Sequence, residues 1–148
     1  MPALKSRGSL NLNLEKIAAG AEALVQQYDV RTPGVQVPAV TLSGGNQQKV
    51  ILAREFSREP EFLLVTQPTR GLDVGAIEYI HSQILDMRSK GVAILLISLE
   101  LEEIFSLSDR IEVMFEGQLV KSFKPEETDE KEVGLYMTGG SGGSGDAE

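Results

Sequence analysis

Ser43, Gly44 and Gly45 have the types and spacing of a phosphate-binding turn at the start of a helix. They stand in the stretch LSGGNQQKV, residues 42–50. A Ser-Gly-Gly turn that opens a helix presents free backbone N–H groups and the positive end of the helix dipole. The glycines let an anion approach the backbone, and the hydroxyl of Ser43 donates a further hydrogen bond. On the residues alone, an ordinary N-capped helix with a flexible entrance is an equal alternative.

Other polar residues have plainer interpretations. The single histidine, His81, follows the apolar face of a predicted helix, which favours a boundary position over a functional one. Arg54 is best explained by an ion pair on a helix surface. For Arg70, a contact with phosphate and a plain surface position are about equally favoured. The acidic residues Glu100, Glu102 and Glu103 lie in the first turns of a predicted helix. The helix dipole stabilises acidic side chains at such positions, so they do not predict a metal site.

The elements that must position these residues are helices alternating with short strands. Apolar residues at helical spacing predict helices over residues 14–28, 44–58, 74–90, 100–107 and 126–137. Short apolar runs predict buried strands at residues 62–66 and 92–98. A hairpin of strands 111–115 and 118–123 is expected to turn at Glu116-Gly117. This alternation predicts a parallel sheet in an α/β fold.

Composition excludes several classes of function. The chain has 148 residues and a net charge of −8, which argues against a nucleic-acid binder and against a polybasic membrane anchor. It contains no cysteine and one histidine, which excludes thiolate metal sites and sites built from several histidines. The longest apolar runs are far shorter than the ~20 residues that cross a bilayer. We therefore expect a cytoplasmic chain.

Three stretches of the sequence resemble one family. LSGGNQQKV resembles the signature motif of ABC-transporter ATPases, in the form found in importers of sugars and nucleosides. FLLVTQPTRGLDVGA, residues 62–76, is similar to that family's Walker B strand and D-loop, and residues 95–120 resemble its switch strand and closing strands. The resemblance runs from about Tyr28 to Phe123 and is most like the second ATPase half of nucleoside-type importers. It implies part of a P-loop NTPase (RecA-like) sheet with helices, with the Walker A portion absent.

Three catalytic elements of the family are missing or neutral in this chain. No G-x-x-x-x-G-K-[ST] motif occurs in the sequence. Thr66 and Gln67 stand where the family has a magnesium-orienting Asp and a catalytic Glu, and an amide cannot accept the proton of the attacking water. Leu99 aligns with the switch histidine. We therefore expect no intact catalytic residue, no bound metal or nucleotide, and no ATP hydrolysis by the chain alone.

The resemblance implies that the remaining motifs serve a partner. ABC ATPases pair head to tail, and each nucleotide lies between the Walker A motif of one half and the signature of the other. The residues expected to bind the partner's nucleotide in trans are then Ser43, Gly44, Gly45 and Gln47. The same interface is crossed by the D-loop residues Gly71, Leu72 and Asp73. ATP and magnesium would be the cofactors of the intact transporter.

The same resemblance divides the chain into four parts. Residues 1–41 are expected to be a remnant of the helical subdomain with its amphipathic helix, and residues 42–123 to run from the signature helix to the closing hairpin. Residues 124–138 form an acidic C-terminal helix, and residues 139–148 a flexible Gly/Ser tail or linker. Because the Walker A strand would lie between the strands at 92–98 and 111–115, we expect a sheet gap that closes by rearrangement or by swapping with a second copy.

Two functions are consistent with these observations. The first is that of a fragment of the ATP-binding subunit of a bacterial importer for nucleosides or simple sugars, which supplies its signature motif to a partner's ATP site. Its partners would be the other ATPase half, a transmembrane permease and, for the fragment, a swapped second copy, all at the cytoplasmic side of the inner membrane. The alternative is a non-catalytic interaction or regulatory module with an ABC-ATPase-like fold.

Overall fold

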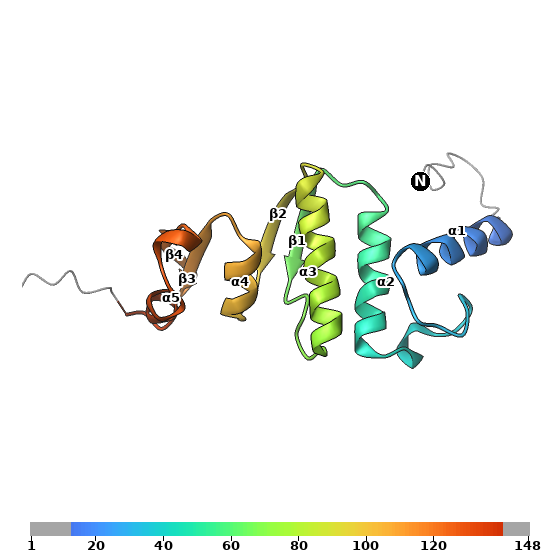
Figure 1. Cartoon of the computed structure of the whole chain (residues 1–148), viewed down its shortest axis with the longest axis horizontal. Coiled ribbons are helices and arrows are strands. Elements are labelled where there is room, and N and C mark those ends of the chain that lie inside the picture. Colours follow the sequence, from blue (N-terminus) through green and yellow to red (C-terminus); the bar gives the residue numbers. More distant parts are fainter. Residues whose placement is uncertain (1–12, 141–148) are drawn as a thin grey trace, which may run out of the picture. The chain divides into compact units, whose positions relative to one another are not determined.

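The computed structural model describes residues 13–140, which form two compact units (Figure 1). The first unit extends to Leu95 and the second begins at Leu96. Residues 1–12 and 141–148, which include most of the predicted Gly/Ser tail, lie outside the described residues. Within residues 13–140, none of the helices combines the length and the apolar character that a membrane span requires.

The first unit contains three α-helices and two paired strands. The helices are α1 (Leu14–Gln27), α2 (Gly44–Phe56) and α3 (Val74–Ser89), and a short 3-10 helix at Ala39–Thr41 precedes α2. β1 (Phe62–Thr66) pairs with β2 (Ala93–Ile97), whose last residues pass into the second unit. The Ala93 N–H donates to the Glu61 carbonyl at 3.0 Å, so both strands start at the same end of the sheet and run parallel.

Local signals in the sequence set the limits of these helices. Asn13, Ser43 and Asp73 each accept a hydrogen bond from the backbone N–H three residues further on, which caps α1, α2 and α3. Gly91 follows the end of α3 with a φ of 85°, a left-handed conformation that glycine adopts without strain. The predicted helices over 14–28, 44–58 and 74–90 are confirmed to within two residues.

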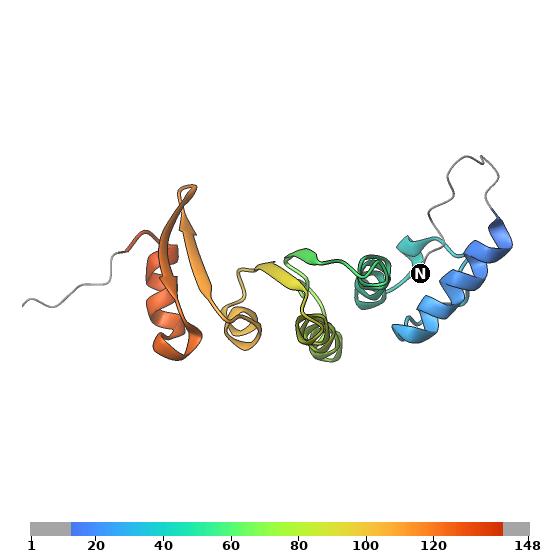
Figure 2. The same cartoon turned by 90° about the horizontal axis from the view of Figure 1, so that it is seen from above.

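The core of the first unit lies between α2, α3 and one face of the β1–β2 sheet. Figure 2 shows these helices and strands from above. Its buried apolar side chains are Tyr28, Val30, Leu52, Ala53, Phe56, Leu63, Val65, Ile80, Ile84 and Met87. The prediction that both strands are buried is wrong, because only alternate residues of β1 are buried and no residue of β2 is. In the described residues, helices cover only one face of this sheet.

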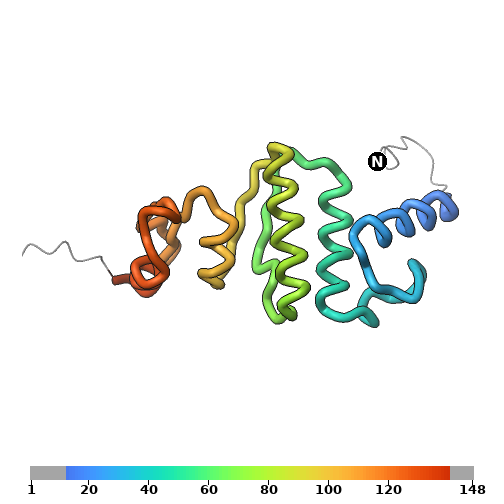
Figure 3. The backbone as a smooth tube through the Cα atoms, in the orientation of Figure 1, coloured from blue at the N-terminus to red at the C-terminus, as the bar shows by residue number. Residues whose placement is uncertain are grey.

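The second unit is a β-hairpin with two α-helices, which can be followed along the chain in Figure 3. α4 (Leu101–Leu107) precedes β3 (Ile111–Phe115) and β4 (Gln118–Phe123), which pair antiparallel. The predicted turn is confirmed, since Glu116 and Gly117 have φ values of 46° and 77°, which suit a two-residue hairpin turn. α5 (Glu130–Met137) covers the hairpin, with a core of Ile111, Val113, Phe123 and Val133.

Two further predictions need correction. The last helix begins at Glu130 rather than at residue 126, because Asp129 caps it and residues Pro125–Glu127 form a separate 3-10 helix. The single predicted sheet is divided into two, since β1 pairs only with β2 and β3 only with β4 among the described strands. No rearrangement closes the predicted gap among the described strands, since β2 and β3 belong to separate sheets. Swapping with a second copy and the four-part division of the chain remain predictions.

Candidate functional site

The start of α2 is an N-capped turn with free backbone N–H groups. Ser43 is extended, and its Oγ accepts hydrogen bonds from the backbone N–H and the side-chain amide of Asn46, at 3.5 and 2.9 Å. The N–H groups of Gly44 and Gly45 belong to the first turn, where no carbonyl of the helix reaches them. Because α2 is 13 residues long, its dipole adds positive potential at these groups.

Gln47 turns back toward the chain that enters α2. Its Nε2 donates to the Leu42 carbonyl at 2.9 Å. The side chain therefore stabilises the turn into the helix instead of extending away from it. The predicted contact between Gln47 and a nucleotide remains a prediction, and it requires this hydrogen bond to open.

The D-loop residues lie against the same end of α2. A Cβ on Gly44 would lie 3.4 Å from Leu72 Cδ2, and a Cβ on Gly45 would lie 3.1 Å from the Cβ of Ala76. The first turns of α2 and α3 are therefore in contact, and the two helices lie side by side in Figures 1 and 2. Asp73 Oδ1 accepts the Ala76 N–H at 2.9 Å and caps α3. We call Ser43, Gly44 and Gly45 the signature turn. The structure thus brings the signature turn and the D-loop to one end of the α2–α3 pair.

Two consecutive turns carry the chain from β1 to α3. The carbonyl of Gln67 accepts the Arg70 N–H at 3.4 Å, and the carbonyl of Thr69 accepts the Leu72 N–H at 3.1 Å. Gly71 has a φ of 73°, which the second turn requires. Gln67 has a φ of 48°, a left-handed conformation that is strained for a residue with a Cβ. The position of the family's catalytic Glu therefore has an unusual backbone but a neutral side chain.

The side chains at the end of β1 do not fit a magnesium site. Thr66 and Gln67 carry no charge, whereas magnesium prefers carboxylate and phosphate oxygens. Within residues 13–140, no three acidic, histidine or cysteine side chains gather where they could hold a metal ion. Leu99, in the second unit, is apolar and 69% exposed. The assignment of the signature residues to a phosphate therefore remains a prediction.

A group of contacts that the sequence analysis missed holds α2 further along its length. Lys49 Nζ lies 2.8 Å from Asp29 Oδ2 and 2.9 Å from the Asp29 carbonyl oxygen. It also lies 4.3 Å from the centre of the Tyr79 ring, which is a cation–π contact. The Tyr79 hydroxyl donates to the Tyr28 carbonyl at 2.9 Å. We call Asp29, Lys49 and Tyr79 the clamp, since it joins α2 and α3 to the chain after α1.

Asn46 joins the signature turn to the chain just after the clamp residue Asp29. Asn46 Oδ1 accepts the Arg31 N–H at 2.7 Å, while its Nδ2 donates to Ser43 Oγ. The hydrogen bond from Lys49 holds the pKa of the Asp29 carboxyl below its ordinary value of 3.8. Burial raises the pKa of the Tyr79 phenol above 10.0, and the Asp29 carboxylate acts in the same direction. These contacts fix the side chain whose hydroxyl is predicted to meet a phosphate.

The remaining candidate residues have structural roles. Arg54 Nε lies 2.6 Å from Glu55 Oε1 on the exposed side of α2, the surface ion pair that its place in the helix predicts. His81 is half-buried on α3. Glu103 is buried in α4, four residues before the buried Leu107. None of these positions adds a ligand to the signature turn.

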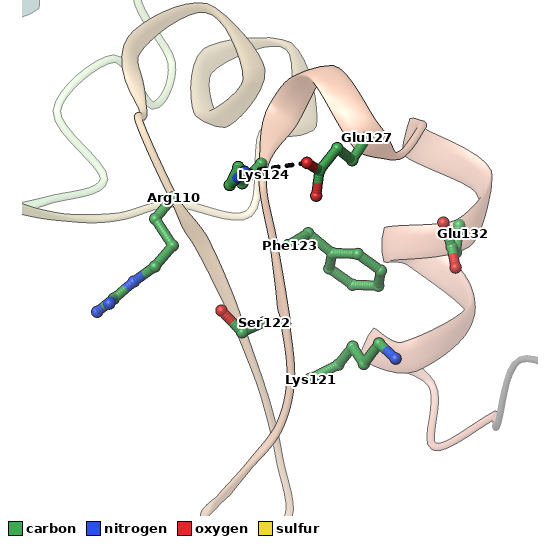
Figure 4. A pocket seen from close by; sticks show the side chains of 7 residues that line it. All are labelled: Arg110, Lys121, Ser122, Phe123, Lys124, Glu127 and Glu132. Atoms are coloured by element: carbon green, nitrogen blue, oxygen red, sulfur yellow. Dashed lines mark hydrogen bonds and ion pairs between the residues drawn. The ribbon is translucent and has the colours of Figure 1, made fainter.

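The second unit has a hollow of about 430 Å³ (Figure 4). Arg110 Nε lies 3.0 Å from Glu112 Oε1, and Lys124 Nζ lies 3.0 Å from Glu127 Oε1. Each of these cations is thus balanced by a carboxylate. The other lining residues are Lys121, Ser122, Phe123 and Glu132. Because both cationic and acidic side chains line the hollow, its lining does not select an anion or a cation.

Comparison of sequences identifies relatives that share most of this chain. It is 56% identical over 119 residues to the guanosine import ATP-binding protein NupO of Bacillus subtilis, covering 80% of this chain and 23% of that protein. It is 50% identical to the nucleoside import ATP-binding protein NupA of Lactococcus lactis, covering 95% of this chain and 27% of that protein. The chain thus spans about a quarter of the length of these curated relatives. No protein-family model matches it.

Comparison of structures places the fold among ATP-binding cassettes. A dimeric cassette in a post-hydrolysis state bound to ADP and Pi has a TM-score of 0.65 and 23% identity, covering 82% of this chain and 51% of that chain. A nucleotide-free cassette from an ABC transporter has a TM-score of 0.63 and 24% identity, covering 74% of this chain and 43% of that chain. The predicted fold, part of a P-loop NTPase sheet with helices, is confirmed.

Proposed function

Since this chain is homologous to a segment of the ATP-binding subunits of nucleoside and sugar importers, we propose that it supplies the signature side of an ATP site in such a subunit. It would correspond to the C-terminal part of the second nucleotide-binding domain, with a nucleoside or a simple sugar as the transported solute. The phosphate loop, the metal ligands and the catalytic base of that ATP site would come from a partner half.

The observation that carries this proposal is the contact between the first turns of α2 and α3. It places Gly44 beside Leu72 of the D-loop and Gly45 beside Ala76 of α3, and the described residues contain no cluster of three acidic, histidine or cysteine side chains that could hold a metal ion. Preorganised N–H donors stabilise the charge that develops on a phosphoryl group during transfer. A site with such donors and without a general base is suited to complete a partner's reaction.

Each residue of the site has a defined part in this proposal. The Ser43 hydroxyl and the N–H groups of Gly44 and Gly45 would hold the terminal phosphate of a nucleotide bound by the partner half. Asn46 orients Ser43 Oγ through its 2.9 Å hydrogen bond. Asp73 would cross the interface at the start of α3. ATP and magnesium would arrive with the partner half, and the assembly would dock on a permease at the cytoplasmic side of the membrane.

A chimera tests the proposal. The 119 matched residues of the Bacillus guanosine import ATP-binding protein are replaced by those of this chain, and ATP hydrolysis and guanosine uptake are measured. We expect both activities to persist. Ser43→Asp keeps an N-cap of similar quality but sets a negative charge against the phosphate, so we expect hydrolysis to fall roughly 100-fold.

The control places the same charge elsewhere in the first unit. Ser82 is exposed on α3, and Ser82→Asp should leave hydrolysis unchanged. Equal hydrolysis by the Ser43→Asp and Ser82→Asp chimeras would show that the signature turn binds no phosphate. That result would favour the alternative of an interaction or regulatory module with this fold.

A further inference from the structure

Arg70 is an exposed arginine in the loop from β1 to α3, close to the signature turn. Leu72, two residues further along this loop, lies 3.4 Å from where a Cβ on Gly44 would stand. Two residues span at most about 7 Å of chain, so the backbone of Arg70 is no further than this from that of Leu72. Arg70 therefore belongs to the part of the loop that borders the first turn of α2.

The backbone on both sides of Arg70 is fixed by the loop. Pro68 and Thr69, which precede Arg70, are buried. The Arg70 N–H donates to the Gln67 carbonyl at 3.4 Å, and Gly71 follows with a left-handed φ of 73°. The arginine side chain thus starts from a defined point at the surface, between a buried anchor and a tight turn.

The guanidinium of Arg70 has no carboxylate partner within residues 13–140, where its side chain makes neither an ion pair nor a hydrogen bond. In the same unit, Lys49, Arg54 and Lys90 each have a carboxylate oxygen close by, at 2.8, 2.6 and 2.6 Å. Asp73, the acidic residue nearest to Arg70 in the sequence, caps α3 instead. A guanidinium presents a planar set of N–H donors that matches the oxygens of a phosphate. The charge and the donors of Arg70 are thus available to an anion.

We propose that Arg70 binds the terminal phosphate of the nucleotide at the signature turn and adds a positive charge to the N–H donors of Gly44 and Gly45. This inference rests on the proposed function, in which a partner half holds that nucleotide. The backbone groups contribute only dipoles, whereas the guanidinium neutralises part of the charge on the phosphoryl oxygens. Because this charge redistributes as the phosphoryl group is transferred, Arg70 accelerates hydrolysis more than it tightens the binding of ATP.

The test uses the chimera in which this chain replaces the matched residues of the Bacillus guanosine import ATP-binding protein. Arg70→Gln removes the charge, and we expect the kcat of ATP hydrolysis to fall at least about tenfold while KM changes less than about threefold. Arg70→Lys keeps the charge without the planar donors and should give an intermediate rate. The midpoint of thermal unfolding should be the same in both variants as in the unchanged chimera, since neither loses an ion pair or a hydrogen bond of the described residues.

The matched control is Arg54→Gln, which removes an exposed arginine from the last turn of α2 and should leave kcat unchanged. Three results would overturn the proposal: an unchanged kcat in Arg70→Gln, an equal loss in Arg54→Gln, or a loss that accompanies a lower unfolding midpoint. Hydrolysis that Ser43→Asp reduces and Arg70→Gln leaves intact would refute only the role of Arg70. Hydrolysis that neither substitution affects would refute the proposed function itself.

Discussion

At the scale of single residues, Lys49 joins α2 to Asp29 and to Tyr79 of α3. Its side chain is only 13% exposed, yet its ammonium has a carboxylate, a carbonyl and an aromatic ring as partners. A lysine this far from solvent requires such partners, because desolvation penalises its charge. Asp29 in turn has a left-handed φ of 47°, which the contacts of Lys49 help to maintain. The clamp therefore couples an unusual backbone to the helix that begins at the signature turn.

Replacing Lys49 with methionine should destabilise the first unit. Lys49→Met keeps the length of the side chain but removes the cation–π contact with Tyr79 and the hydrogen bond to the Asp29 carbonyl. We expect a loss of about 1 kcal/mol in the free energy of unfolding, measured by urea titration. Arg54→Met removes an exposed ion pair and should have no measurable effect. Similar losses in both variants would contradict a special role for the clamp.

The Asp29 carboxyl predicts a dependence of stability on pH. Its folded pKa lies below its ordinary value of 3.8, so its contribution is present above that value and is lost as the pH falls through the folded pKa. Between about pH 6 and about pH 3, the wild-type chain should therefore lose more stability than Asp29→Asn. Urea titrations at both pH values measure the difference. Parallel pH profiles would exclude Asp29 as a source of stability.

Among the elements, the approach of α2 to α3 determines where the signature turn meets the D-loop. Gly45 allows this approach, because a Cβ there would lie only 3.1 Å from the Cβ of Ala76. The position of Gly44 is less crowded, with 3.4 Å to a terminal methyl group of Leu72. The two adjacent glycines thus differ in what they contribute: Gly45 is needed for helix packing, and Gly44 leaves the backbone open.

Alanine substitutions should separate these two roles. Gly45→Ala must push the first turns apart, and we expect a net loss of about 1 kcal/mol even after the gain in helix propensity. Gly44→Ala should be neutral or stabilising by up to about 0.5 kcal/mol, since its methyl group makes an ordinary contact. Thermal unfolding of the two variants measures the difference. If both were stabilised, the helices would be less closely packed than the structure indicates.

Local signals explain which elements the sequence could predict. Ser43 as a cap, Gly91 as a stop and Glu116-Gly117 as a hairpin turn act within a few residues, so the helices and the hairpin are predictable. The start of α5 differs from the prediction because Pro125 begins a separate 3-10 helix and Asp129 caps the α-helix that follows.

Long-range contacts explain what the sequence could not predict. Asp29 and Lys49 are 20 residues apart, and the Tyr79–Tyr28 hydrogen bond joins residues 51 apart, so no local pattern marks the clamp. The exposure of Phe62 and Leu64 depends on whether a second layer covers the sheet, which the apolar run in β1 does not reveal. The sequence predicts a capped helix start at the signature turn, but only the structure shows that this turn lies against the D-loop.

For the whole molecule, the described residues contain the turn that is proposed to meet a phosphate, and a sheet with exposed residues on one face. The proposed function assigns the turn to a nucleotide phosphate that a partner half would hold. The net charge of −8 does not oppose this interpretation, because residues 124–148 contain seven acidic and two basic residues and thus account for −5 of it. The signature turn therefore lies in the nearly balanced part of the chain.

The most direct test of the central claim, that the chain has only the signature side of an ATP site, is calorimetric titration of the isolated chain with ATP, with and without magnesium. We predict no saturable, magnesium-dependent heat up to about 1 mM ATP, because Thr66 and Gln67 offer no carboxylate to a magnesium ion. Magnesium-dependent binding with a Kd of about 1–10 μM would contradict the account.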